Sequence, residues 1–185
     1  MNESAWLPSR HYYDVRLRRE ICMKVRGHHL CCTYCFYGSG KRTAEEFFGV
    51  DNAIPELLRK LQENPDMEIE VTDDFDDVCE ICPLKRPEGC GRGEGKPGGI
   101  AAQNEKLRKW DQVILKRLNL KVGEVITARE LQNRLGKCIP DIGQICTNCT
   151  SASPSGFAEY RRALEKGLWS DLEDKSSIPR EEKHI

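Results

Sequence analysis

Three Cys-x-x-Cys pairs limit how this chain can fold, and they are Cys32 with Cys35, Cys79 with Cys82, and Cys146 with Cys149. Two cysteines at this spacing can bind one metal atom or cluster without unfolding of the backbone between them. The second and third pairs lie more than 60 residues apart, far beyond the ~15–20 residues of a compact zinc ribbon. If the pairs share a site, a folded domain must assemble it from distant segments.

The length of 185 residues suits one domain with short appendages. We expect an N-terminal extension over residues 1–20, a cysteine-rich metal-binding domain over residues 21–170 and a flexible tail over residues 171–185. A domain of this size buries a real core without help from disulfides. The even number of cysteines would also fit a disulfide scaffold, but such scaffolds are usually smaller and secreted.

Charge and hydropathy exclude several classes of protein. The net charge of −1 leaves no basic excess for nucleic acid or for an acidic membrane. No apolar run approaches the roughly 20 residues that span a bilayer, and the first residues lack the apolar core of a secretory signal. We therefore predict a cytoplasmic protein, where paired cysteines more often hold metal or do redox work than form structural disulfides.

Apolar periodicity predicts an α+β fold. Alternation predicts strands over residues 21–26 and 67–72, and a helix starting at Ile54 and ending at Asn64 is a suitable crossover between parallel neighbours. Further helices are expected around residues 107–118 and 157–164. The result is a mostly helical single domain with a small two- or three-stranded sheet and cysteine-bearing loops.

Local sequence also predicts helix starts and one long loop. Thr43 and Thr127 each precede a glutamate by three positions, which is typical of a capping box in which the two side chains satisfy each other's amides. Residues 87–99 contain six glycines and two prolines and are predicted to be loop. These glycines lack the ending of a phosphate-binding loop, so we interpret them as allowing close approach of the chain to a metal.

The strongest metal-binding pattern is Cys79 and Cys82, followed by Pro83 and by Cys90. A Cys-x-x-Cys turn directs both sulfurs and several backbone amides toward one point, and those amides can stabilise thiolate or cluster charge. Zinc accepts the same ligands in tetrahedral geometry. Cys146 and Cys149 could complete the site.

The segment from Arg26 to Cys35 contains His28 and His29, our candidates for catalytic residues. A histidine here could bind metal, donate a proton to substrate or donate to a cluster sulfur; the alternative is a histidine satisfied by a backbone carbonyl. His28 and Cys32 can share a helix face. One of the adjacent Cys31 and Cys32 is expected to pack as a small apolar residue.

The remaining polar and cysteine residues are interpreted more simply. The acidic run of Asp73, Asp74, Asp76 and Asp77 lacks the spacing of a calcium loop and is predicted to be a solvated turn. Cys22 and Cys138 have no close partner in the sequence and are predicted to be core residues.

The order of these motifs resembles a small bacterial and archaeal family, domain of unknown function 1284, over about residues 23–165. The resemblance rests on Arg26-Gly27-His28-His29-Leu30-Cys31-Cys32, Asp77-Val78-Cys79-Glu80-Ile81-Cys82-Pro83, Cys90, Asp111-Gln112-Val113 and Ile145-Cys146-Thr147-Asn148-Cys149. It implies iron–sulfur binding and carries the ligand role onto Cys32, Cys79, Cys82, Cys90, Cys146 and Cys149. This chain departs from the family pattern in three ways. Gly27 replaces the usual proline, Cys31 replaces a leucine, and there is an N-terminal extension.

The leading hypothesis is therefore a metal-binding protein that holds a [4Fe–4S] cluster for electron transfer or substrate activation. Such a cluster needs four ligands, and we predict Cys79, Cys82, Cys90 and the remote Cys149, which leaves the others spare or for a second metal. Its partner would be a redox protein or a small-molecule substrate. The alternatives are a structural zinc module that mediates protein contacts and a thiol redox enzyme, which needs a cysteine of lowered pKa.

Overall fold

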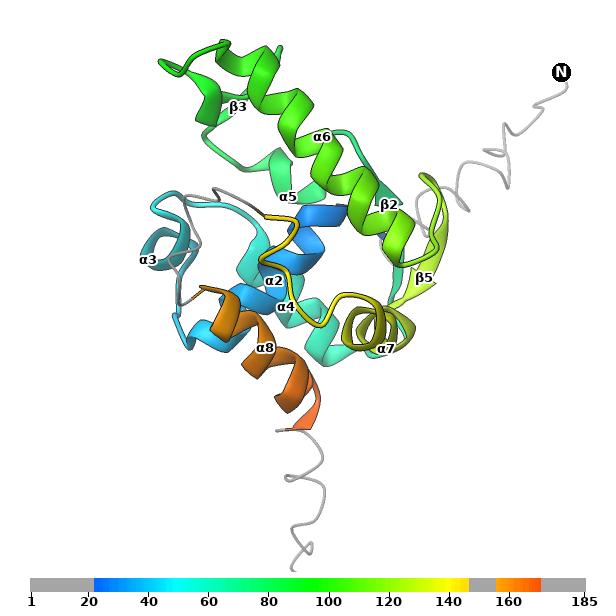
Figure 1. Cartoon of the computed structure of the whole chain (residues 1–185). Coiled ribbons are helices and arrows are strands. Elements are labelled where there is room, and N and C mark those ends of the chain that lie inside the picture. Colours follow the sequence, from blue (N-terminus) through cyan, green and yellow to red (C-terminus); the bar gives the residue numbers. More distant parts are fainter. Residues whose placement is uncertain (1–21, 147–155, 171–185) are drawn as a thin grey trace, which may run out of the picture.

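The computed structural model describes residues 22–146 and 156–170. In chain order the elements are β1 (Cys22–Arg26), α2 (Gly27–Ser39), α3 (Ala44–Phe48), α4 (Ile54–Glu63), β2 (Glu68–Thr72), α5 (Asp77–Glu80), β3 (Lys85–Arg86), β4 (Gly89–Cys90), the 3-10 turn η1 (Gly91–Gly93), α6 (Gly99–Arg117), β5 (Val125–Thr127), α7 (Ala128–Cys138) and α8 (Gly156–Lys166). Helices predominate, and the strands are short (Figure 1). The predicted α+β class is confirmed.

The main sheet has three strands in the order β1-β2-β5. β1 pairs in parallel with β2, with Val25 opposite Val71, and β2 pairs antiparallel with β5, with Ile69 opposite Ile126. Alternate residues of β1 and β2 enter the core, because successive side chains of a strand point to opposite faces. Both predicted strands and their parallel pairing are confirmed, and the helices α2 to α4 form the crossover between them.

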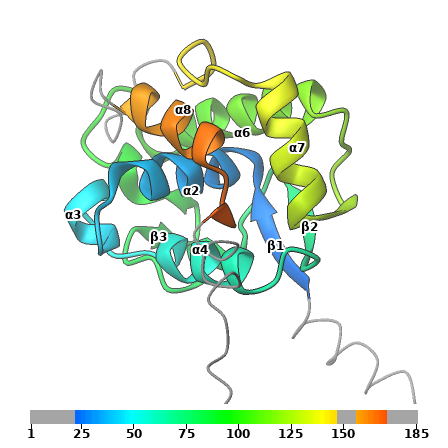
Figure 2. The same cartoon turned by 90° about the horizontal axis from the view of Figure 1, so that it is seen from below.

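Helix α2 follows β1 directly and runs through the middle of the molecule, as Figures 1 and 2 show from two directions. It packs against α8, α4 and α6. Tyr34 of α2 and Tyr160 of α8 are both fully buried and meet edge to face, with ring centroids 6.3 Å apart. Because α2 is enclosed on several sides, the residues in its first turn are fixed in space relative to sheet and helices alike.

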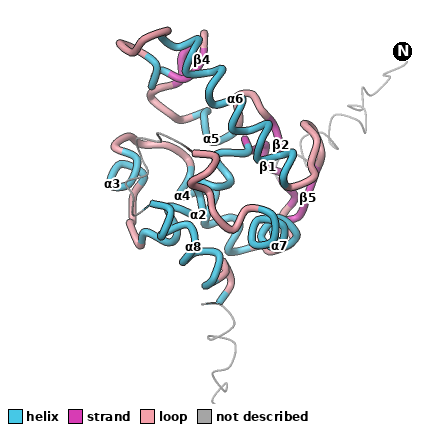
Figure 3. The backbone as a smooth tube through the Cα atoms, in the orientation of Figure 1, coloured by secondary structure: helices cyan, strands magenta, loops and turns pink. Residues whose placement is uncertain are grey.

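The small β3–β4 hairpin lies beside the N-terminal half of α6, and the two extend together beyond the rest of the domain (Figure 3). Lys85 pairs with Cys90 and Arg86 with Gly89 across the hairpin. The prediction of unbroken loop over residues 87–99 is thus wrong in part, since β4 and η1 lie within it. Two-residue strands are too short to produce an alternating pattern in the sequence.

The predicted helix starts are confirmed with one correction. Thr43 and Glu46 form a complete capping box at α3. At α7 the Thr127 side chain accepts from the Glu130 amide at 3.2 Å, but the carboxylate of Glu130 binds Arg134 instead of reaching back. The charged guanidinium of Arg134, one turn further along the helix, binds this carboxylate more strongly than the neutral amide of Thr127 would.

The predicted extension and tail lie outside the described residues, so the domain boundaries stay a prediction. Within the part of the chain that the structure describes, none of the helices combines the length and apolar character that crossing a membrane requires.

Candidate functional site

A cavity of about 130 Å³ lies where the start of α2, α5, the β3–β4 hairpin and α6 meet. Four segments contribute five thiols to its lining, and these belong to Cys32, Cys79, Cys82, Cys90 and Cys146. One water needs roughly 10–15 Å³, so the cavity has room for a guest larger than one water or one ion. The fold therefore gathers five of the six cysteines to which the resemblance assigned a ligand role. The sixth, Cys149, lies outside the described residues.

Consecutive turns bring Cys79 and Cys82 to the cavity. Asp76 is the N-cap of α5, and its Oδ1 accepts from the backbone amide of Cys79 at 3.1 Å. The amide of Cys82 then donates to the carbonyl of Cys79 at 3.2 Å, and the amide of Lys85 donates to the carbonyl of Cys82 at 2.9 Å. Because α5 is a single turn, its cap fixes the position of both cysteines.

Cys90 is held in place by Asn104 of α6. The Asn104 side chain accepts from the backbone amide of Cys90 at 2.8 Å and donates to the carbonyl of Glu88 at 2.6 Å. Gly89 between them has φ 142°, and a Cβ there would lie 1.4 Å from the Asn104 side chain. Glycine is therefore required at Gly89 both for its backbone conformation and for the space that Asn104 occupies.

The three cysteines of α2 have different surroundings. Cys32 lines the cavity, one turn after His28, as the i,i+4 spacing predicted. Cys31 is only 1% exposed and belongs to the hydrophobic core, which identifies it as the packing member of the adjacent pair. Cys35 packs against the same core and does not line the cavity.

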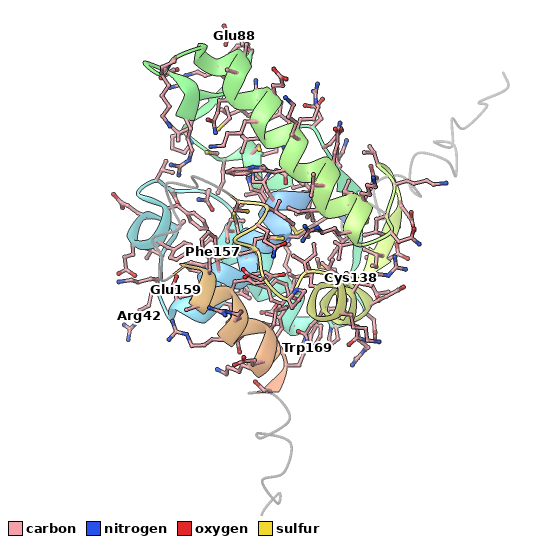
Figure 4. The ribbon with its side chains drawn as sticks, in the orientation of Figure 1. Arg42, Glu88, Cys138, Phe157, Glu159 and Trp169 are labelled. Carbon is pink, nitrogen blue, oxygen red and sulfur yellow. The ribbon has the colours of Figure 1, made fainter. Side chains whose placement is uncertain are left out.

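The other cysteines are also placed by the fold. Cys146 is buried, and its amide donates to the carbonyl of Ile142 at 3.0 Å. Cys22 is half-buried on β1 and is not part of the core, and Cys138 is exposed at the end of α7, so the prediction of both as core residues is wrong. Figure 4 shows Cys138 well away from Glu88, which marks the hairpin tip. No disulfide joins any of the cysteines in the described residues.

His28 is held by a buried ion-pair network. Asp111 of α6 is fully buried, and its Oδ1 lies 2.7 Å from Nδ1 of His28 and 2.8 Å from the His28 amide. Its Oδ2 accepts from Nε of Arg26 at 2.9 Å and lies 2.8 Å from Nη2 of the same arginine. Gly27 lets this approach happen, since a Cβ there would lie 3.1 Å from the Asp111 backbone.

His29 is held in a similar way by Asp76, whose Oδ2 lies 2.7 Å from Nδ1 of His29 and accepts from the Arg26 amide, also at 2.7 Å. Asp76 is 2% exposed, so the prediction of a solvated acidic turn is wrong at this residue. His29, Asp76 and Cys79 each place one ligand-type atom within 4.8 Å of the others. Among the described residues, this is the one such group that approaches closely enough to hold a single ion.

The two histidines are oriented by carboxylates, and this fixes where their protons lie. Burial raises the pKa of Asp111, but His28 and Arg26 outweigh it, so its pKa lies below the ordinary value. An ionised carboxylate only accepts hydrogen bonds, so Nδ1 of His28 carries the proton. Burial lowers the pKa of His28 despite the opposing effect of Asp111, which leaves Nε2 with a lone pair at neutral pH. Both histidines line the cavity.

Burial disfavours ionisation of several thiols, and Cys79 is the one of them that lines the cavity. Burial, followed by the negative charge of Asp76, raises the pKa of Cys79 far above its ordinary value. The pKa values of Cys31 and Cys22 are raised as well, mainly by burial. A bound metal would reverse this, because a coordinating thiol is deprotonated outright.

No three of the cavity thiols approach one another as closely as the sulfurs around a bound zinc ion do. Zn–S bonds of ≈ 2.3 Å in a tetrahedron put sulfurs roughly 3.8 Å apart. Among the described residues, no three cysteines gather within 4.8 Å of one another, although five line one cavity.

Comparison with known proteins adds one finding. A family model described as "Protein of unknown function (DUF1284)" matches residues 45–153. The chain belongs to this family. No curated protein and no solved structure matches the chain.

The stretch that matches the DUF1284 model contains Cys79, Cys82 and Cys90, together with the two histidine-orienting carboxylates, Asp76 and Asp111. Sequence reasoning gave neither aspartate a role. For Asp111 a usable pattern existed: it lies between Leu107 and Ile114 at helical spacing, on the apolar stripe of α6. A carboxylate on a buried helix face requires a buried partner. For Asp76 the pattern was its N-cap position, three residues before Cys79.

Proposed function

We propose that this protein holds a [4Fe–4S] cluster in the five-thiol cavity and activates a substrate beside it. The observation that carries the proposal is the convergence of Cys32, Cys79, Cys82, Cys90 and Cys146 on one space of about 130 Å³. A thiol with a raised pKa, such as that of Cys79, is unfavourable as a nucleophile, but it becomes a good ligand once a metal takes its proton.

Cys79, Cys82 and Cys90 are the proposed core of the ligand set, since the α5 turn and the hairpin hold them rigidly. The fourth ligand comes from the remote segments, which offer Cys149, the ligand predicted from sequence, and the two cavity thiols of Cys32 and Cys146. When bound, a cluster of this kind supplies one-electron chemistry or a Lewis-acidic iron.

The histidine pair favours substrate chemistry over simple electron transfer. A carrier needs only a protected cluster, whereas this cavity is lined by two histidines, each oriented by a buried carboxylate. Asp111 and Asp76 hold the rings through Nδ1, so that Nε2 of His28 can accept a proton from a bound molecule, or return it. The apolar side chains of Trp110 and Leu107 line the same cavity.

A mononuclear zinc site is the second candidate, favoured by the close approach of His29, Asp76 and Cys79. Against it, the carboxylate of Asp76 already accepts from the amides of Arg26 and Cys79 and binds His29. An ion there would have to displace the His29 bond that orients the ring. The thiol redox alternative is disfavoured at the Cys79/Cys82 pair, because the pKa of Cys79 is raised rather than lowered.

The experiment compares metal content across matched cysteine variants purified without oxygen. Iron and acid-labile sulfide should both be present in the wild type and in Cys138→Ser, whose thiol is exposed and outside the cavity. Both should fall sharply in Cys79→Ser and Cys90→Ser, and the same assay on Cys32→Ser, Cys146→Ser and Cys149→Ser identifies the fourth ligand. One zinc per chain without iron would contradict the cluster and support the mononuclear zinc site. The cytoplasmic location predicted from the sequence remains part of the proposal, since such a compartment protects a cluster from oxygen.

A further inference from the structure

The cavity has a second chemical feature besides its thiols. Three cationic side chains line it: Arg92 of η1, Lys96 of the following loop and Lys106 of α6. Among the described residues, no aspartate or glutamate lines the same cavity. An anion that enters would meet three positive charges, whereas the nearby carboxylates of Asp76 and Asp111 lie behind the histidines and are bound by them and by Arg26.

Two neighbouring cations outside the cavity are held by carboxylates. Arg86 of the hairpin binds Glu94 at 2.6 Å, and Lys109 of α6 binds Glu105 at 2.6 Å. Arg92 instead donates to a neutral acceptor, the carbonyl of Phe48, at 2.9 Å. A guanidinium has five N–H donors in a planar fork that matches the geometry of a carboxylate. The single bond to Phe48 therefore leaves Arg92 with enough donors to bind a carboxylate.

The rest of the wall on this side is apolar. Phe48, Val50, Leu107 and Trp110 line it, and Nζ of Lys106 lies 4.6 Å from the Trp110 ring centroid. Small-molecule sites typically combine such an apolar lining with a few convergent polar groups. The lining therefore suits a molecule that has both an acidic group and an apolar body.

We propose that this cavity binds a small organic carboxylate, with the acid group facing Arg92, Lys96 and Lys106 and the apolar body against Trp110. The proposal rests on the proposed function in one respect: the acid is the substrate activated beside the metal and the His28–His29 pair. Binding of the acid itself uses only protein side chains and needs no metal.

The competing explanation is that the three cations only balance the negative charge of metal-bound thiolates. In that case their removal weakens metal binding, but no organic acid binds. The two explanations differ in a measurement that does not depend on turnover, namely the affinity of the cavity for an anion and for its neutral analogue.

The experiment is titration calorimetry on the full chain, purified without oxygen, with propionate, propionamide and inorganic phosphate as separate probes. Propionate and propionamide have nearly the same shape and differ in charge. We expect propionate to bind at millimolar or lower concentration and propionamide to bind at least about tenfold more weakly, since the neutral amide cannot form charge-assisted hydrogen bonds with the cations. Equal affinity for the two probes, or no binding of propionate, would overturn the proposal. Tighter binding of phosphate than of propionate would overturn the assignment to an organic acid.

Variants locate the site. Lys106→Gln and Lys96→Gln should each weaken propionate binding about tenfold, whereas Lys109→Gln, on the same helix but outside the cavity, should change it less than about twofold. Arg92→Gln is tested with them, and because it also removes the contact with Phe48, its thermal unfolding is compared with that of the wild type. Equal effects of Lys106→Gln and Lys109→Gln would contradict the placement.

Iron content measured on the same samples separates this proposal from the previous one. Propionate binding in a protein without iron would support the acid-binding site and contradict the cluster. Iron in a protein that does not bind propionate would support the cluster and contradict the acid-binding site.

Discussion

Nδ1 of His28 and Oδ1 of Asp111 lie 2.7 Å apart, although 83 positions separate the two residues in the chain. The bond joins the first turn of α2 to the middle of α6, and Arg26 binds the other oxygen of the same carboxylate. This contact is what fixes α6, with its cavity-lining residues, relative to the histidines and to Cys32. The geometry of the site therefore depends on one buried carboxylate that binds no guest itself.

Asp111→Asn should destabilise the fold strongly. The substitution leaves Arg26 buried, at 4% exposure, without its carboxylate partner, and breaking a buried pair from one side costs about 3–5 kcal/mol. Urea unfolding followed by circular dichroism measures the change. Glu105→Gln on the same helix is the control, because Glu105 is 68% exposed and should leave the free energy of unfolding nearly unchanged. A loss no larger than that of the control would show that the network is not structural.

Acid should remove the same stabilisation. Arg26 and His28 face Asp111 and keep its folded pKa below the unfolded value of about 4. On acidification the unfolded chain takes up the proton first, so the stabilisation is fully present above about pH 4 and is lost as the pH falls through the folded pKa. The difference in free energy of unfolding between wild type and Asp111→Asn should thus be constant near pH 5 and shrink below about pH 4. A difference that does not change with acid would contradict this account.

Gly89→Ala should loosen the hairpin and release Cys90. An added methyl would meet the Asn104 side chain, and φ 142° is unfavourable for any L-residue. The expected cost is about 1–3 kcal/mol, concentrated at the amides of Cys90 and its neighbours. Amide hydrogen exchange should show faster exchange there. Gly95→Ala is the matched control, since Gly95 also has positive φ but nothing within 4 Å of the added methyl.

Removal of the metal should leave the domain core folded. Val25, Ile69 and Leu131 are fully buried in a core that packs without the cavity thiols of α5 and the hairpin. After chelation we expect exchange protection to persist in β1, β2 and α4 and to fall at Cys79, Cys82 and Cys90. Loss of protection throughout the chain would instead indicate a structural metal of the zinc-module type.

Local periodicity predicted much of the fold, because the elements concerned are long enough to repeat. The helix from Ile54 ends at Asn64 as expected, and the strand around Ile69 pairs in parallel with β1. The two-residue strands of the hairpin were missed, since no pattern fits into so few residues. Only half of the capping box predicted at Thr127 forms, because Arg134, one turn further along the helix, binds the carboxylate of Glu130.

The sequence marked cysteines that line the cavity, but it did not reveal the roles of the carboxylates. Cysteine spacing marked Cys79, Cys82 and Cys90, all of which line the cavity. Spacing alone could not tell which of Cys31 and Cys32 faces it, because that depends on the rotation of α2 against the core. Asp76 and Asp111 act across the fold, through Arg26 and the histidines, and such pairings have no signature in a single sequence beyond a charge where an apolar residue belongs.

The most direct test of the central claim is the electron paramagnetic resonance spectrum of the full chain, purified without oxygen and then reduced with dithionite. We predict a brown protein whose reduced form gives the signal of a [4Fe–4S] cluster, and loss of that signal in Cys79→Ser but not in Cys138→Ser. A colourless protein without iron, or a signal that survives Cys79→Ser, Cys82→Ser and Cys90→Ser alike, would contradict the claim that these thiols gather around a cluster.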